Sequence, residues 1–216
     1  SGQSTRQLLI ADLKTLIGSS ELYDVTQDAA GKAVVVEKLN RIYSVGNKEV
    51  EGKVNLIEEN VFDGDIEATI VSISVDAPLT LTLDNYSVLS SDKNLQGKLA
   101  GQDNALVYPF MGWDVAITSD QSDNDRPDLL IQSWFNAIGD LAIDGNSDTT
   151  FVSAEGLDYQ QLVNKFLLGA VTYSQGADDY LKPSKGLVKQ NTAGDKDGTK
   201  PYTALEHQWD EGFGYF

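Results

Sequence analysis

The chain has 216 residues, of which 41% are hydrophobic and 9% aromatic, so it can bury a sizeable core in one domain or two small ones. Its 16 basic and 33 acidic residues give a net charge of −17, which disfavours nucleic acids and anionic membrane surfaces as partners and favours cations. The absence of cysteine excludes disulfides and thiolate chemistry, and no run of about eighteen apolar residues is present to span a bilayer.

The N-terminal part of the chain is predicted to form two amphipathic helices. Ser4-Thr5-Arg6-Gln7 is typical of a capping box, so the first helix is expected to begin there and to end at Gly18. The second helix is expected to end at Gly46. The apolar residues that recur at helical spacing in these segments are Leu9, Leu13, Leu16 and Ile17, then Val35, Leu39, Ile42 and Tyr43.

Residues 67–83 follow a different period. Apolar residues alternate with serine and then with threonine, on either side of a turn at Asp76-Ala77-Pro78. Alternation with a period of two, rich in β-branched residues, predicts strands. The alternating apolar positions are Val71, Ile73 and Val75, then Leu79, Leu81 and Leu83. We therefore expect a small β insertion, either an edge flap or a small satellite of a helical domain.

Three more helices are predicted in the second half of the chain. Pro127 suits the first turn of the third helix, where the missing N–H costs nothing. Thr199 and Pro201 are expected to open the fifth helix, which carries His207. The third helix has a wide apolar stripe, and the fourth repeats it. The stripes are Leu130, Ile131, Trp134, Phe135, Ile138, Leu141 and Ala142, then Leu162, Val163, Phe166, Leu167, Ala170 and Tyr173.

These segments together predict a mainly α fold. The expected architecture is a helical-bundle-like single domain over residues 1–216, with a β-containing insertion at about residues 50–90. The chain begins at Ser1 without a leader and ends in an aromatic run at Phe216. We therefore expect the processed N-terminal part of a longer chain, whose C-terminal remainder is a partner of this domain.

The single histidine, His207, marks the first candidate site. Glu206, Asp210 and Glu211 lie within one helical turn of it, and neighbours at i+3 and i+4 share a helix face. Imidazole and carboxylate ligands suit iron, manganese or zinc. A zincin peptidase needs a second histidine, in the motif H-E-x-x-H, and the sequence has only one. The G-x-S-x-G motif that would support a serine hydrolase is also absent. The sequence therefore predicts a divalent metal site on the last helix, without a defined reaction.

Residues on other elements must complete such a site. Asp178, Asp179 and the element Gly112-Trp113-Asp114 are available for this, and Trp113, Asp114 and Trp209 are candidate contacts for a ligand or partner. The alternative is structural: His207 caps a turn or hydrogen-bonds a buried carboxylate, while Trp209 and Phe213 pack in the core.

The loop from Asp144 to Glu155 is the second candidate site. Its oxygen-bearing residues occupy positions 1, 3, 5 and 12 of an EF-hand loop, which suits calcium, although Thr149 stands where that loop needs a glycine. Those residues are Asp144, Asn146, Asp148 and Glu155. The alternative is a polar loop in which aspartate and asparagine form turns and caps.

The C-terminal segment also resembles a known family. The run E-H-x-W-D-E-x-F-G-Y-F at residues 206–216 resembles the signature of a family of bacterial envelope proteins catalogued as a domain of unknown function. Residues 1–6 resemble its S-G-Q-T-x-R start, and Gly112-Trp113-Asp114 resembles its G-W-D element. Its longest motif is similar to residues 157–176. The resemblance spans most of the chain and is weakest at about residues 50–90.

The resemblance implies a periplasmic or surface-anchored lipoprotein, distantly similar to imelysins, the iron-regulated helical proteins of bacterial envelopes. Their H-x-x-E motif would correspond to residues 207–210, with Asp210 in place of the glutamate or Glu211 one residue later. Three functions stay open. They are an iron-linked envelope protein that binds a metal or a protein partner, an imelysin-like metallopeptidase, and a calcium-stabilised extracellular structural or assembly protein. A homo-oligomer is compatible with each.

Overall fold

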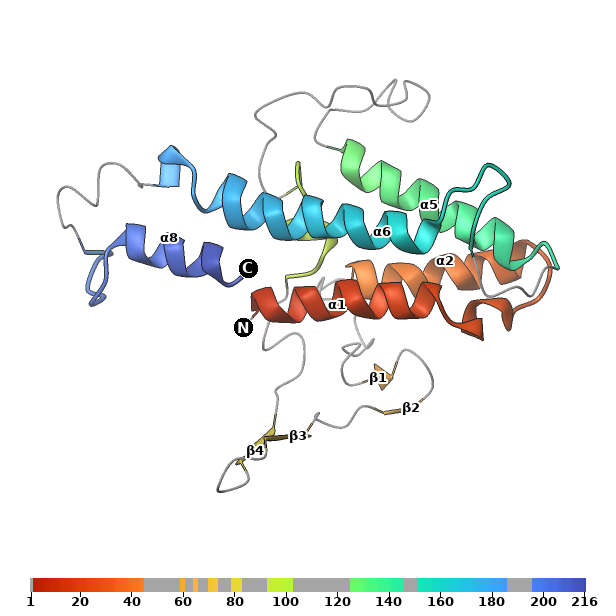
Figure 1. The fold of residues 1–216 in the computed structure, drawn as a ribbon, viewed down its shortest axis with the longest axis horizontal. Coiled ribbons are helices and arrows are strands. Elements are labelled where there is room, and N and C mark those ends of the chain that lie inside the picture. Colours follow the sequence, from red (N-terminus) through yellow and green to blue (C-terminus); the bar gives the residue numbers. More distant parts are fainter. Residues whose placement is uncertain are drawn as a thin grey trace.

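The computed structural model describes residues 2–44, 59–60, 64–65, 70–73, 79–82, 93–102, 125–145, 151–185 and 196–216. The fold over these residues is mainly helical, as predicted. Four helices carry its core: α1 (Gly2–Ile17), α2 (Ala29–Ser44), α5 (Arg126–Ala142) and α6 (Tyr159–Leu167). Each of these helices contacts two of the others, α1 and α5 both packing against α2 and α6 (Figure 1). The bundle is therefore closed around a shared interior.

The apolar stripes predicted for the first three helices line this interior. Leu13, Leu39 and Phe135 are fully buried, and the ring of Tyr43 meets that of Phe135 edge to face at a centroid distance of 5.6 Å. The Tyr43 hydroxyl donates a hydrogen bond of 2.8 Å to Asp128 Oδ1, which satisfies the one polar atom at this position. Periodicity therefore identified the core-facing side of α1, α2 and α5.

The start of α1 differs from its prediction. The helix begins at Gly2 rather than at a cap on Ser4. Gln3 and Arg6 are buried in its first two turns and bind side chains of the C-terminal segment. Long-range contacts therefore hold the helix start. The predicted end at Gly18 is correct, because Ser19 caps a following 3₁₀ turn, η1 (Ser20–Tyr23).

The helix α2 starts with a local cap. The Asp28 carboxylate accepts a hydrogen bond of 2.9 Å from the Gly31 N–H, and this bond lowers the pKa of Asp28. Gly31 is required here, because a Cβ at this position would lie 1.7 Å from the carbonyl oxygen of Thr26. The helix ends at Ser44, and the predicted stop at Gly46 lies outside the described residues.

Two short antiparallel pairings follow α2 in the chain. β1 (Glu59–Asn60) pairs with β2 (Gly64–Asp65), and β3 (Ile70–Ile73) pairs with β4 (Leu79–Thr82). The second pair lies within the predicted β segment, with Ile70 opposite Thr82 and Ile73 opposite Leu79. The predicted turn at residues 76–78 and the alternating positions Val75 and Leu83 lie outside the described residues.

Residues 93–102 connect the end of α2 to the C-terminal half. Asn94 donates a 2.7 Å hydrogen bond to the Ser44 carbonyl and accepts one from Gly97 N–H, shaping the 3₁₀ turn η2 (Gln96–Lys98). The Ala100 N–H donates to the Ala170 carbonyl at 2.7 Å. Buried Leu95 and Leu99 join the bundle interior. This segment therefore fixes the position of the chain that follows α6.

The fourth predicted helix consists of an α-helix followed directly by a π-helix. α6 begins at the Asp158 cap and passes without a break into a π-helix, η3 (Leu168–Asp179). A π-helix bonds each residue to the fifth one along and turns less per residue than an α-helix. Tyr173, predicted on the apolar stripe, is consequently 65% exposed, whereas Ser174 and Gln175 are buried. The prediction for Tyr173 is wrong because it assumed the α-helical period throughout.

The last helix is α8 (Ala204–Phe213), and it lies along η3 beside the start of α1, so the two ends of the chain are neighbours (Figure 1). It begins at Thr203 rather than at Thr199 and Pro201, because residues 196–203 form a tight turn closed by bonds between Asp197 and Tyr202 and between Lys200 and Asp197. Among the described residues, no helix is long and apolar enough to cross a membrane.

Candidate functional site

The sequence of α8 defines its own beginning. The Thr203 side chain accepts a hydrogen bond of 3.1 Å from Glu206 N–H, and the Glu206 carboxylate accepts one of 2.6 Å from Thr203 N–H. This reciprocal capping box satisfies two backbone donors of the first turn. The bond from the Thr203 backbone lowers the pKa of Glu206 below its usual range. The acidic side chain that precedes His207 therefore belongs to the helix cap.

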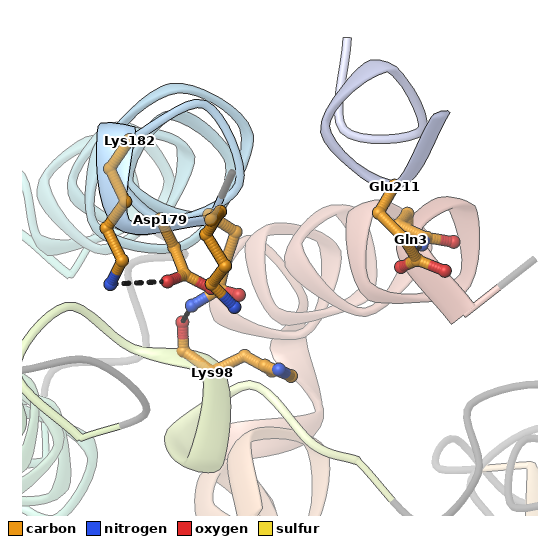
Figure 2. A network of polar contacts seen from close by, with 7 residues as sticks. Gln3, Lys98, Asp179, Lys182 and Glu211 are labelled. Atoms are coloured by element: carbon orange, nitrogen blue, oxygen red, sulfur yellow. Dashed lines mark hydrogen bonds and ion pairs between the residues drawn. The ribbon is translucent and has the colours of Figure 1, made fainter. Parts of the chain in front are cut away.

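One side of α8 is attached to α1 through polar groups. Gln3 Nε2 donates a hydrogen bond of 2.6 Å to Glu211 Oε2, and Figure 2 shows Gln3 extending from α1 to Glu211 beneath α8. Arg6 Nε donates to the Tyr215 hydroxyl at 3.0 Å, and Gln7 Nε2 donates to the Tyr215 carbonyl at 2.8 Å. The Arg6 guanidinium also lies over the Tyr215 ring. Three residues of α1 thus fix the end of α8 that carries the aromatic run.

A second side of α8 packs closely on η3. A Cβ at Gly212 would lie 3.0 Å from the Gly176 carbonyl oxygen, and a Cβ at Gly176 would lie 3.3 Å from the Gly212 carbonyl oxygen. The two backbones therefore approach each other closely because both positions are glycine. Beside them, buried Tyr215 stacks on Tyr180 with the ring centroids 6.1 Å apart. The close approach and the stacked rings hold α8 at a defined distance from η3.

The side of η3 that faces residues 93–102 is anchored by buried polar residues. Gln175, fully buried, donates a 3.0 Å hydrogen bond from Nε2 to the Lys98 carbonyl. Asp179, also buried, pairs with Lys182 at 2.9 Å and Lys185 at 3.4 Å. Figure 2 shows this cluster between η3 and the segment that carries Lys98, apart from the Gln3 and Glu211 pair. η3 is therefore tied to residues 93–102 by a face other than the one that supports α8.

The remaining side of α8 faces outward and carries aromatic residues. Trp209 is 59% exposed and Phe213 67%. Trp209 and Phe213 are one helical turn apart and share a face. Glu206 and Asp210, both exposed, lie beside them on the same half of the helix. The structural alternative in which Trp209 and Phe213 pack in the core is therefore wrong, because Gly212 and Tyr215 occupy the inward positions.

The candidate metal ligands of α8 do not share one side of the helix. Glu206, in the capping box, and Asp210 lie on the exposed side, whereas Glu211 faces α1. His207 stacks on Tyr202 at a centroid distance of 5.6 Å. Within the described parts of the chain, no group of three or more histidine, aspartate or glutamate side chains is placed to hold a metal ion. The structure therefore does not gather this ligand set on one face.

The candidate calcium loop is described only at its ends. Asp144 follows α5 and is exposed, and Asn146 and Asp148 lie outside the described residues. Glu155 is exposed in a tight turn, in which Ser153 Oγ accepts hydrogen bonds of 3.2 Å from the N–H groups of Glu155 and Leu157. Trp113 and Asp114 also lie outside the described residues. The calcium site and the Gly112-Trp113-Asp114 contact stay predictions.

The sequence analysis did not identify the partners of α8 on α1 or a groove at the other end of α6. Gln3 and Gln7 are polar, so the apolar period gave no signal that the first turn of α1 is covered. The groove has a volume of about 520 Å³, and the Trp134 ring meets the Phe166 ring edge to face within it. Its apolar lining residues are Trp134, Leu157, Leu162 and Phe166.

The architecture and the site define a mainly helical, bundle-type domain with a closely packed C-terminal helix. Residues 135–216 match the family described as Domain of unknown function (DUF4856), so a DUF4856 domain occupies this part of the chain. The match runs from the middle of α5 through α6, η3 and α8. The comparison with curated proteins gave no match, and the comparison with solved structures gave none.

Proposed function

We propose that this protein is a binding protein of the bacterial cell envelope, and that it holds a protein partner on the outer face of α8. One observation carries the proposal. The helix is attached on two sides by specific contacts, yet its third side presents Trp209 and Phe213 to solvent. Scattered exposed apolar residues are ordinary, whereas adjoining large aromatic side chains are typical of interaction surfaces.

The geometry favours binding energetically. Covering a side chain as large as Trp209 or Phe213 contributes roughly 1.5–3 kcal/mol when it is fully buried. Aromatic residues at the centre of an interface are frequent hot spots. A helix that is already fixed by Gln3, Arg6 and Gln7 loses little conformational entropy when a partner docks. The outer face of α8 is therefore preorganised for a partner.

Binding is a better account of the site than metal-dependent hydrolysis. A metallopeptidase would need Asp210 or Glu211 as the base beside a metal on His207. Glu211 instead accepts a short hydrogen bond from Gln3 and helps to attach α8 to α1. We also propose the envelope location and the link to iron. Their support is the resemblance of residues 206–216 to the envelope family.

Site-specific photocross-linking in the producing cells tests the proposal. A benzophenone amino acid at position 209 or 213 is expected to give a discrete protein adduct, which excess wild-type protein suppresses and excess Trp209→Ala protein does not. Positions 152 and 157, which carry exposed apolar residues at the other end of α6, are matched controls. Equal adducts from all four positions, or none from positions 209 and 213, would contradict the proposal.

Metal analysis provides an independent check on the alternatives. Elemental mass spectrometry of the protein purified without chelators would be compared for wild type, His207→Ala and Glu155→Ala. If the wild-type protein holds stoichiometric iron or zinc and only His207→Ala loses it, α8 carries a metal site and the proposal of partner binding is wrong. Calcium lost only in Glu155→Ala would instead support the calcium-stabilised structural protein.

A further inference from the structure

The outer face of α8 combines aromatic rings with carboxylates. Glu206, Trp209, Asp210 and Phe213 follow the spacing i, i+3, i+4 and i+7, so they lie on one side of the helix. All four are exposed. The carboxylates form a row beside the aromatic pair. The face is therefore amphipathic in itself, with an apolar strip and an acidic strip running in parallel.

The electrostatics of this face favour a cation. The helix from Ala204 to Phe213 contains no lysine or arginine, and the whole chain carries 33 acidic against 16 basic residues. The negative end of the α8 dipole lies at Phe213, next to the aromatic strip. An exposed tryptophan ring attracts lysine and arginine through its π face. Basic side chains would therefore gain from Trp209 and Asp210 together.

We propose that the outer face of α8 binds a basic amphipathic helix of a partner protein. This inference rests on the proposed function and names the chemistry of the partner. Apolar residues of that helix would cover Trp209 and Phe213, which lie one helical turn apart and so match anchors at i and i+4. Its lysines or arginines would lie beside Glu206 and Asp210. Electrostatic attraction would speed encounter and exclude acidic partners.

Fluorescence anisotropy with defined peptides tests this inference. The probe is a labelled eighteen-residue helix of leucine and lysine with all leucines on one face. Controls are a scrambled peptide of the same composition and a peptide with glutamate in place of lysine. We expect the amphipathic lysine peptide to bind wild type with a dissociation constant on the order of 10 µM, as suits a small interface. The two control peptides are expected to bind at least about ten-fold more weakly.

Variants of the protein locate the binding surface. Trp209→Ala should weaken binding about ten-fold, as loss of a hot-spot residue does, and Asp210→Asn about three-fold, as loss of an exposed ion pair does. Glu155→Gln removes one exposed carboxylate at the opposite end of α6 and should change nothing. All three positions are exposed, so far-ultraviolet circular dichroism should show an unchanged fold. Equal binding to wild type, Trp209→Ala and Asp210→Asn would overturn the inference, because attraction to the net charge alone would then explain it.

The inference and the proposed function can fail separately. Adducts at positions 209 and 213 together with no peptide binding, or with stronger binding of the glutamate peptide, would overturn the basic-helix inference and leave partner binding intact. If no adducts form at positions 209 and 213 and no peptide binds, both the inference and the proposed function are overturned.

Discussion

The four-helix core and the α8 end of the molecule are held together by different interactions. In the core, apolar residues at helical spacing fill a shared interior, and Leu13, Leu39 and Phe135 are fully buried. At the α8 end, one helix is attached by single polar contacts such as Gln3 to Glu211 and by the close approach of Gly176 and Gly212. Many apolar contacts therefore specify the bundle, whereas a few specific ones position α8.

Truncation in the core should have the largest effect. Phe135→Ala removes a fully buried ring that meets Tyr43 edge to face, and it should lower the free energy of unfolding by about 3–5 kcal/mol. Leu8→Ala, at an exposed position of α1, should change it by less than about 0.5 kcal/mol. Urea unfolding followed by circular dichroism measures both. Similar losses for the two variants would show that the core does not depend on this packing.

Adding one methyl group between α8 and η3 should have the next largest effect. Gly212→Ala places a Cβ 3.0 Å from the Gly176 carbonyl oxygen, so α8 must shift, at a cost of about 1–3 kcal/mol. Gly169→Ala is the matched control, because a Cβ there meets no atom within 4 Å. That change should stabilise by about 0.4–1 kcal/mol through the unfolded state. Equal stability of both variants in urea would contradict the close helix contact.

Removing one hydroxyl tests the polar attachment of α8. Tyr215→Phe deletes the acceptor of the Arg6 Nε hydrogen bond at a buried position, which should cost about 1–3 kcal/mol. The loss should appear as faster proteolysis within residues 204–216, with little change in the α2 region. Tyr173→Phe, at a position of η3 that is 65% exposed, serves as the control. Uniform loss of protection across the chain would argue against a separately attached α8.

The smallest effect is expected at the α8 cap. Thr203→Ala should cost about 1 kcal/mol. The pKa of Glu206 is lowered in the folded state, so its contribution to stability is present above its ordinary pKa of 4.5 and is lost as pH falls through the lower folded value. The stability difference between wild type and Glu206→Gln should therefore be constant near neutral pH and shrink below about pH 4.5. A difference that grows on acidification would contradict the assigned bond.

The helical spacing of apolar residues predicted the bundle well, because residues three or four apart share the face of a helix that is buried. The predicted stripes of α1 and α2 are buried, and Pro127 stands in the first turn of α5. In α5, Ile131, Phe135, Ile138 and Ala142 are buried, whereas Leu130, Trp134 and Leu141 are half-buried. The same reasoning failed at Tyr173, because nothing in the apolar pattern distinguishes a π-helix from an α-helix. It also failed at the start of α1, where binding to residues 211 and 215 replaces a local cap.

The candidate site was only partly predictable. The choice of the segment around His207 as a candidate site followed from its composition, but the direction of each side chain depends on which face of α8 meets η3. That face is chosen by Gly212 and Tyr215, which make Trp209 and Phe213 outward residues. Glycine in a helix predicts weak propensity rather than a docking face, so the sequence could not show this contact.

Hydrogen–deuterium exchange of α8 tests most directly whether this helix is a fixed platform. The structure predicts that the backbone amides of residues 208–213 are protected to a degree similar to those of α6, although the outer side chains face solvent. It further predicts that Tyr215→Phe releases these amides and leaves those of α2 unchanged. Exchange of residues 208–213 in the wild-type protein at the rate of an unstructured peptide would contradict a preorganised binding face.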